Sequence, residues 1–275
     1  MSPRRSLLFV SIWISTAIVF AFGLWYYTDS QHFVEFLTCY VIEWSLSLDN
    51  LFVFLMIFRS FGVVPHNQLR VLEWGIIGAI VLRLGFILIG VKLVALFNPI
   101  LYFFGALLLI SAYRMAFSKE EHSDIQKNKM VAWMRRRFAI TKNYYGDKFF
   151  IRKAGRIFGT PMVLVLVTIE SSDIMFAIDS IPAAFAITQK PFIIFTANMF
   201  AILGLRSLYF LLAHAENMFS KLRYGVTIIL AFVGAKIILD QLGFHLGHTI
   251  SLGVVVVCIG GSILLSLITD RKKEG

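Results

Sequence analysis

Charged residues are scarce in this sequence. Asp, Glu, Lys and Arg make up 15% of its 275 residues, whereas hydrophobic residues make up 58%. Soluble domains are about 25% charged and about 45–50% apolar, so this composition excludes an ordinary soluble protein. The mean hydropathy of +0.78, together with several apolar runs longer than about 18 residues, predicts a helical membrane protein with many spans.

Cysteine is also nearly absent, and motifs of hydrolytic enzymes are missing. The two cysteines, Cys39 and Cys258, each lie inside an apolar run, which argues against a disulfide framework and a thiolate metal site. His245 and His248 lie three residues apart in a short loop, and from the sequence alone a functional role is not expected of them. Because neither HExxH nor GxSxG occurs, we do not expect an enzyme.

The apolar runs predict an all-α polytopic protein with about eight spans in a single transmembrane domain. The first run, which begins near Leu7, is too long for the apolar region of a signal peptide, so we expect it to be retained. Thr160 and Pro161 provide an N-cap and a first helical residue for the fifth span. The spans are predicted at residues 7–27, 33–58, 70–91, 98–117, 160–188, 192–213, 223–240 and 250–268.

Basic residues gather in the loops on one side of these spans, and the loops on the other side have few of them. The loop of residues 118–159 has eleven Lys and Arg against four acids, and the other basic segments follow every second span. The positive-inside rule therefore predicts a plasma (inner) membrane protein with both termini in the cytoplasm. The net charge of +10 indicates contact between the 118–159 loop and anionic lipid rather than nucleic-acid binding. Residues 129–138 are expected to form a membrane-surface helix, and a solvated basic linker is the alternative.

A motif in the second span returns in the fifth. The motif is an acid, five residues of any kind, an aspartate and a small polar residue. It occurs first as Glu43, Asp49 and Asn50, and again as Asp173, Asp179 and Ser180. Acids inside apolar spans are costly and mark ion or proton pathways.

Basic residues repeat with the acids. Arg83 lies deep in the third span and Arg206 deep in the sixth, and we expect both to pair with the acids; Arg114 and Lys236 are interpreted as snorkelling to the interface. Each unit has three spans, so the second must enter from the opposite side. The sequence thus predicts an inverted repeat, with residues 33–117 and 160–240 as the units, residues 7–32 as an extra N-terminal span and residues 250–268 as the last span.

Helix geometry limits how the acids can converge. Glu43 and Asp49 are six residues apart, which places them about 120° out of phase on a regular helix. The same holds for Asp173 and Asp179. Either a helix unwinds near Asn50 or before Pro182, or some of these acids serve other partners such as Arg83.

The ligand chemistry of this site would be all oxygen. Such a set suits Mn²⁺, Mg²⁺ or Ca²⁺ rather than Cu⁺ or Zn²⁺. Loss of the ion would leave carboxylates that repel one another and take up protons, which favours exchange of metal for protons. The alternative is an acid–arginine network that only locks the helices together. The predicted metal ligands are Glu43, Asp49, Glu170, Asp173 and Asp179, with Asn50, Ser180, Arg83 and Arg206 in auxiliary roles.

Three segments resemble the TerC family of membrane proteins, and specifically its Alx-like branch. They are residues 36–54 (FLTCYVIEWSLSLDNLFVF), 169–183 (IESSDIMFAIDSIPA) and 198–210 (NMFAILGLRSLYF). The resemblance extends over nearly the whole chain. Trp44 stands where a lysine is common in that family, and Leu48 where a valine is.

The resemblance implies export of manganese from the cytoplasm, with Mn²⁺ as the transported ion and no organic cofactor. It also implies a link to the alkaline pH response. All five acids of the family's two motifs have counterparts here. The alternative from a different class is a membrane metal sensor or metallochaperone that binds Mn²⁺ and contacts a partner through the 118–159 loop.

Overall fold

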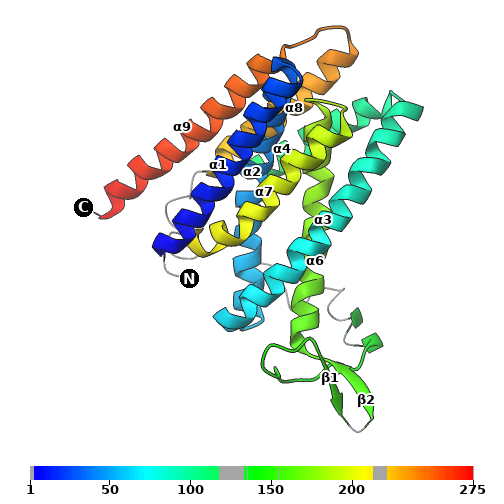
Figure 1. The fold of residues 1–275 in the computed structure, drawn as a ribbon, viewed down its shortest axis with the longest axis vertical. Coiled ribbons are helices and arrows are strands. Elements are labelled where there is room, and N and C mark those ends of the chain that lie inside the picture. Colours follow the sequence, from blue (N-terminus) through cyan, green and yellow to red (C-terminus); the bar gives the residue numbers. More distant parts are fainter. Residues whose placement is uncertain (1–2, 118–132, 135, 154, 213–221, 275) are drawn as a thin grey trace.

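A computed structural model shows how the spans are arranged (Figure 1). It describes residues 3–117, 133–134, 136–153, 155–212 and 222–274. Within these ranges, the side chains of residues 3–4, 49, 206, 211–212, 222 and 267–274 are also outside the description. Eight helices in the described part are long and apolar enough to cross a membrane, which confirms the all-α, multi-span prediction.

The first three spans are α1 (Pro3–Tyr27), α2 (Ser30–Ser60) and α3 (Pro65–Leu96). In Figure 1 the chain runs up α1, down α2 and up α3. Asp29 caps α2 by accepting a hydrogen bond from the backbone N–H of His32 at 2.7 Å, and this contact lowers the pKa of Asp29. The turn into α3 uses Gly62 at φ +62°, a conformation that favours glycine, and Pro65 then opens the helix.

The fourth span is α4 (Ile100–Phe117), and an antiparallel hairpin of β1 (Phe150–Lys153) and β2 (Arg156–Gly159) precedes the next helix. The sequence analysis did not predict this hairpin. The segment before it is tied to the connection between α2 and α3, because the Tyr144 hydroxyl donates to the Phe61 carbonyl at 2.8 Å. Arg70 also pairs with Asp147. Half of the predicted surface helix at 129–138 lies outside the described residues, and residues 133–134 and 136–137 are helical.

The remaining spans are α6 (Pro161–Phe185), α7 (Pro191–Leu212), α8 (Leu222–Gln241) and α9 (His248–Glu274). Thr160 caps α6 by accepting a hydrogen bond from the Met162 N–H, and Pro161 follows it, as predicted. We call the side of the bundle that carries β1 and β2 the hairpin face. The start of α1 and the end of α9 lie toward this face, and the α8–α9 connection lies at the other (Figure 1).

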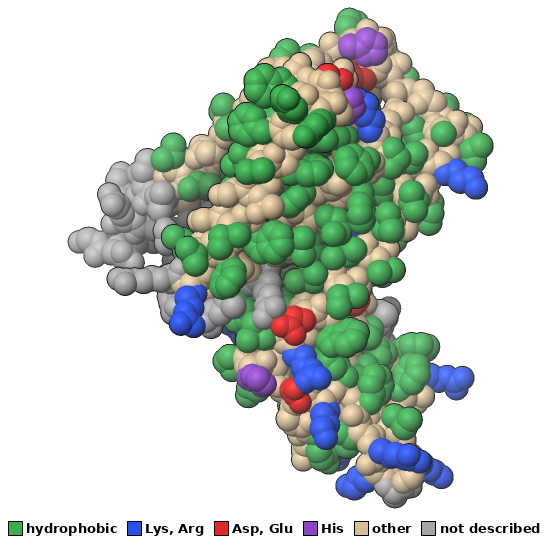
Figure 2. All heavy atoms as spheres, in the orientation of Figure 1, with side chains coloured by type: hydrophobic (Ala, Val, Ile, Leu, Met, Phe, Trp, Pro, Cys, Tyr) green, Lys and Arg blue, Asp and Glu red, His purple; other side chains and the backbone are tan. Residues whose placement is uncertain are grey.

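The surface of the bundle is apolar. Large hydrophobic side chains stand exposed along the helices, for example Val19, Ile89 and Val257 at 70%, 64% and 71%. Figure 2 shows these hydrophobic side chains over the helical part, with many of the visible Lys and Arg side chains near the hairpin. Such a belt is the surface that a bilayer requires.

Helix packing follows the predicted repeat, in which α2, α3 and α4 correspond to α6, α7 and α8. The repeat requires that contacts occur in equivalent pairs. Accordingly, α2 packs on α7 as α3 packs on α6, and α4 packs on α6 as α8 packs on α2. The equivalent helices α4 and α8 also pack on each other. This pattern supports the inverted repeat, which stays a prediction.

The contact between α4 and α8 depends on two facing glycines. A Cβ atom on Gly105 would lie 2.7 Å from Ile238 Cγ1 and 3.0 Å from the Gly234 carbonyl oxygen, and one on Gly234 would lie 3.0 Å from the Gly105 oxygen. Small residues of this kind allow membrane helices to approach closely.

We expect Gly105→Leu to destabilise the protein by about 1–3 kcal/mol, because an added side chain must push α4 away from α8. Thermal unfolding in detergent measures this loss. The matched control is Gly85→Leu, since a Cβ at Gly85 meets no atom within 4 Å. Equal melting temperatures for the two variants would show that the α4–α8 contact does not require glycine.

Candidate functional site

The predicted site is organised around Arg83, which α3 places between α2 and α6. The guanidinium is 1% exposed. Its Nη1 donates to Glu43 Oε2 at 2.6 Å, and its Nη2 and Nε donate to the two carboxylate oxygens of Asp173 at 3.3 and 3.4 Å. Glu43 and Asp173 are equivalent positions of the two predicted repeat units, so one arginine would bridge both units.

The Arg83 cluster carries a net negative charge when its acids are ionised. Two carboxylates, of which Glu43 is 1% and Asp173 is 6% exposed, face one guanidinium. Buried charges require partners, and one cation cannot neutralise two anions. The cluster therefore favours entry of a further positive charge, either a proton or a metal ion.

Residues on α6 divide between two faces of that helix. Asp173 and Ser180 are seven residues apart and so share a face, and Arg83 Nη1 also contacts Ser180 Oγ at 3.4 Å. Asp179 lies on another face, where its Oδ1 accepts a hydrogen bond from Ser111 of α4 at 2.6 Å. The phase difference predicted for Asp173 and Asp179 is therefore present in the structure.

Glu170 lies one turn before Asp173 and faces α3. A Cβ atom on Gly78 would overlap the Glu170 carboxylate, whereas one on Gly75 would make only ordinary contacts at 3.5 and 3.8 Å. A cavity of about 20 Å³ lies between α2, α3, α6 and α7, and Glu170 and Asp173 are its acidic lining residues. A water-sized particle needs about 10–15 Å³, so this space has room for one water molecule or one dehydrated cation.

Several buried oxygens of α2 and α6 receive no hydrogen bond from the described part of the chain. They include one carboxylate oxygen of Glu43, one of Glu170, and the hydroxyls of Ser45 and Ser47. Ser47 lies one turn from Glu43 on the same face of α2. Buried carboxylate oxygens without partners are costly, and they are the atoms that a hard cation binds.

Two predicted site residues cannot be placed in this geometry. The side chains of Asp49 and Arg206 lie outside the described residues, although α2 and α7 contain their backbones. Asn50 is buried at 7%. Unwinding at Asn50 is not observed, because α2 continues as one helix to Ser60. The structure thus favours the second alternative, in which acids of one motif take different partners.

A larger polar cavity, which we call the vestibule, lies at the face opposite the hairpin. Its volume is about 470 Å³, and its lining includes Glu35, Lys190, Lys236, Asp240, His245 and His248. The snorkelling interpretation of Lys236 is wrong: its side chain is 1% exposed, and Nζ donates to the Ala186 carbonyl at 2.8 Å. Arg114, by contrast, is exposed in the last turn of α4.

The vestibule was not predicted from the sequence, because its residues come from the ends of five helices and the connections between them. An acid within the second apolar span, Glu35, is the sequence feature that could have indicated this cavity. No group of three or more His, Cys, Asp or Glu side chains within the described ranges forms a ready metal site. The described acids that were predicted as metal ligands are instead divided among the Arg83 cluster, the contact with Ser111 and the small cavity.

The chain is similar to known membrane proteins over most of its length. The model of the integral membrane protein TerC family matches residues 28–274. The chain belongs to the TerC family. The family resemblance predicted from the three acid- and arginine-containing segments is thereby confirmed, including its Alx-like character, since the Alx proteins below are similar over nearly the whole chain.

Relatives in bacteria and plants cover most of this chain. Alx of Salmonella typhi is 43% identical over 282 residues, which cover 100% of this chain and 87% of the relative. Alx of Photorhabdus laumondii is 41% identical, covering 99% and 88%. The name of both relatives proposes a membrane-bound redox modulator. The thylakoid membrane protein TERC of Arabidopsis thaliana is 40% identical, covering 96% of this chain and 69% of the relative. No solved structure matches the chain.

Proposed function

We propose that this TerC-family protein exports divalent metal ions, above all Mn²⁺, through the carboxylates of α2 and α6. One observation carries the proposal: two buried carboxylates share a single guanidinium beside a cavity of about 20 Å³, with carboxylate oxygens left unbonded in the described structure. A network that only locked helices together would have no need of surplus negative charge or of unbonded oxygens.

The ligand atoms support a hard cation. Glu43, Glu170, Asp173 and Asp179 offer carboxylate oxygens, and Ser47 and Ser180 offer hydroxyls. Oxygen sets of this kind suit Mn²⁺, Mg²⁺ and Ca²⁺. The family resemblance supports manganese among these ions and transport out of the cytoplasm. We place the hairpin face in the cytoplasm of a plasma (inner) membrane protein, because exposed Arg152, Lys153 and Arg156 lie there, and we expect these residues to contact anionic lipid.

Arg83 gives the site two stable charge states. Carboxylates that lose a bound cation repel one another and can take up protons instead. With metal, the carboxylates turn to the ion while the guanidinium balances the remaining charge. Because proton and metal compete for the same oxygens, inward proton movement can drive outward metal movement.

Purified protein in proteoliposomes should take up Mn²⁺ under a proton gradient, as measured by a Mn²⁺-sensitive dye in the lumen. Reversing or collapsing the gradient should abolish the accumulation. The matched control is protein-free vesicles of the same lipids. If vesicles with the wild-type protein accumulate no more Mn²⁺ than protein-free vesicles, the transport proposal is wrong.

The alternative function is metal sensing or metal supply to a partner. The hairpin favours it, because its fixed position holds Phe150 and Ile157 exposed at 63% and 71%. A sensor would bind Mn²⁺ without moving it, so the proteoliposome measurement separates the two functions. A redox role through the two cysteines has less support, since both thiols are free and Cys39 is buried.

A further inference from the structure

The vestibule contains a buried acid that the proposed transport site does not use. Glu35 is 2% exposed, and the cavity of about 470 Å³ opens beside it. The cavity is bounded by the starts of α2, α4 and α9, the ends of α6 and α8, and the connection of residues 186–190 between α6 and α7. It is therefore formed partly by α2 and α6, the same two helices that supply the acids of the Arg83 cluster.

The carboxylate of Glu35 is surrounded by polar groups from α2 itself, from the connection between α6 and α7, and from the start of α9. Thr188 Oγ1 donates to Oε2 at 3.0 Å, and Lys190 Nζ lies 3.2 Å from the same oxygen. Gln31 Nε2 donates to Oε1 at 2.8 Å. His248 Nε2 stands 4.0 Å from Oε1, which is too long for a hydrogen bond.

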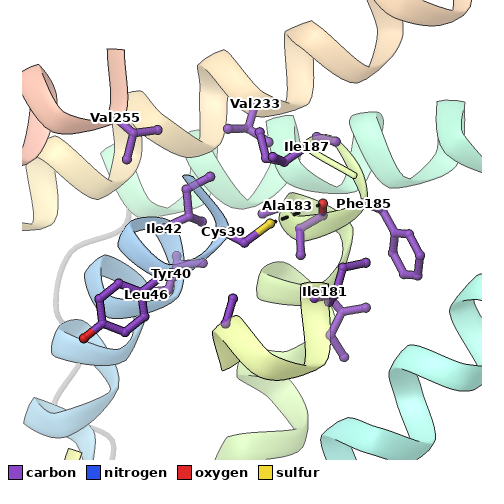
Figure 3. Close-up of a cluster of buried hydrophobic side chains, with 14 of the residues drawn as sticks. Cys39, Tyr40, Ile42, Leu46, Ile181, Ala183, Phe185, Ile187, Val233 and Val255 are labelled. Atoms are coloured by element: carbon purple, nitrogen blue, oxygen red, sulfur yellow. Dashed lines mark hydrogen bonds between the residues drawn. The ribbon is translucent and has the colours of Figure 1, made fainter. Parts of the chain in front are cut away.

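Glu35 is aligned with the Arg83 cluster along α2. Glu35, Cys39 and Glu43 are spaced by four residues and share one face of the helix, with about 12 Å of axial rise from first to last. Cys39 separates the two acids, and its Sγ approaches the Ala184 carbonyl oxygen at 4.0 Å. Figure 3 shows Cys39 among apolar side chains, with Ile181 and Ile187 nearby. An apolar layer therefore closes the route between the cluster and the vestibule.

We propose that Glu35 and His248 form a second binding site for a divalent cation, and that the ammonium of Lys190 occupies this site when the cation is absent. Thr188 supplies a hydroxyl, and Gln31 supplies an amide oxygen if its side chain turns over. One carboxylate, one imidazole and two neutral oxygens suit Mn²⁺ and similar ions. The carboxylate and imidazole come from α2 and α9, so a cation there would join the two helices.

Lys190 is the group that can leave. Its side chain is 42% exposed, so the ammonium can swing into water, whereas Lys236 is 1% exposed and stays on the Ala186 carbonyl. Lys236 also lies 3.9 Å from Asp240, which balances its charge. Departure of Lys190 thus leaves Glu35 as the uncompensated charge in the vestibule, and a divalent cation can replace the ammonium.

The role of this site rests on the proposed function. If the chain exports metal, Glu35 receives the ion after it passes Cys39 and before it reaches the outer solution. Lys190 then returns to Glu35 and helps to expel the ion. Binding itself can be tested apart from transport, because the two sites lie on opposite sides of the apolar layer.

The experiment measures equilibrium Mn²⁺ binding by electron paramagnetic resonance on the full chain in nanodiscs. The background variant is Asp49→Asn combined with Asp179→Asn, which weakens the central site. In this background we expect Lys190→Met to tighten the remaining binding roughly fivefold or more, since a competing ammonium is removed. The matched control is Lys92→Met, a lysine near the end of α3 that does not line the vestibule, and its affinity should not change.

Ligand variants complete the test. Glu35→Gln and His248→Ala should each abolish the tightening that Lys190→Met produces. His245→Ala should not, because His245 lies 3.8 Å from Asp240 and is 80% exposed. Unchanged affinity in Lys190→Met, or equal tightening in Lys92→Met, would overturn the site. Failure of Mn²⁺ transport together with vestibule binding that follows this pattern would overturn the export function alone.

Discussion

Arg83→Met is expected to destabilise the protein by about 3–5 kcal/mol, the usual cost of removing one partner from a buried ion pair. The substitution leaves Glu43 and Asp173 facing each other without a counter-ion at 1% and 6% exposure. Thermal unfolding of the purified protein in detergent measures the loss.

The compensating control neutralises the whole cluster. In the triple variant Arg83→Met, Glu43→Gln, Asp173→Asn, no buried charge remains unpaired, so most of the lost stability should return. Transport should stay absent, because the acids are gone. If the triple variant is as unstable as Arg83→Met alone, the arginine contributes through packing rather than through charge.

Asp179→Asn should lower the rate of Mn²⁺ transport by roughly 100-fold or more, since even changes in the outer shell of a metal site cost about 10–100-fold. The same substitution should change the melting temperature little. The hydrogen-bond partner of Asp179 is the neutral hydroxyl of Ser111, and an asparagine oxygen can accept that bond. A substitution at Asp179 should therefore change the transport rate without changing the stability of the fold. Proteoliposome uptake and thermal unfolding give the two readouts.

Two variants test the interpretation of Asp179. Ser111→Ala removes the hydrogen bond but keeps the carboxylate, so transport should fall much less than in Asp179→Asn. Asp147→Asn alters an acid near the hairpin that pairs with Arg70, and it should leave transport unchanged. Wild-type uptake by a correctly folded Asp179→Asn protein would remove Asp179 from the route.

Much of the fold follows from the sequence through simple constraints. A run of about 20 apolar residues can satisfy its backbone in a bilayer only as a helix, so the spans were predictable. The depth of Arg83 in the third span predicted an acidic partner. Helical phase predicted that Asp173 and Asp179 cannot face one point, and the structure gives them separate partners, Arg83 and Ser111.

Other features depend on contacts that no local pattern encodes. Lys236 was interpreted as snorkelling because its position near a span end allows it, but the Ala186 carbonyl at the end of α6 captures it. Glu35 joins Thr188 and Lys190 across more than 150 residues of sequence. The short strands at 150–159 lack a run long enough to stand out beside apolar spans. In each case tertiary packing selects among side-chain positions that the sequence leaves open.

The pairing of Glu43 with Arg83 bears on how the chain enters the membrane during synthesis. These residues lie 40 positions apart in consecutive spans, whereas Asp173 lies 90 positions beyond Arg83. Each isolated charge would cost about 2.5–3.5 kcal/mol on insertion. If α2 and α3 insert as a pair, their opposite charges cancel at once, well before the ribosome has made α6. The Glu43–Arg83 pair can thus be neutral in the bilayer before α6 supplies Asp173.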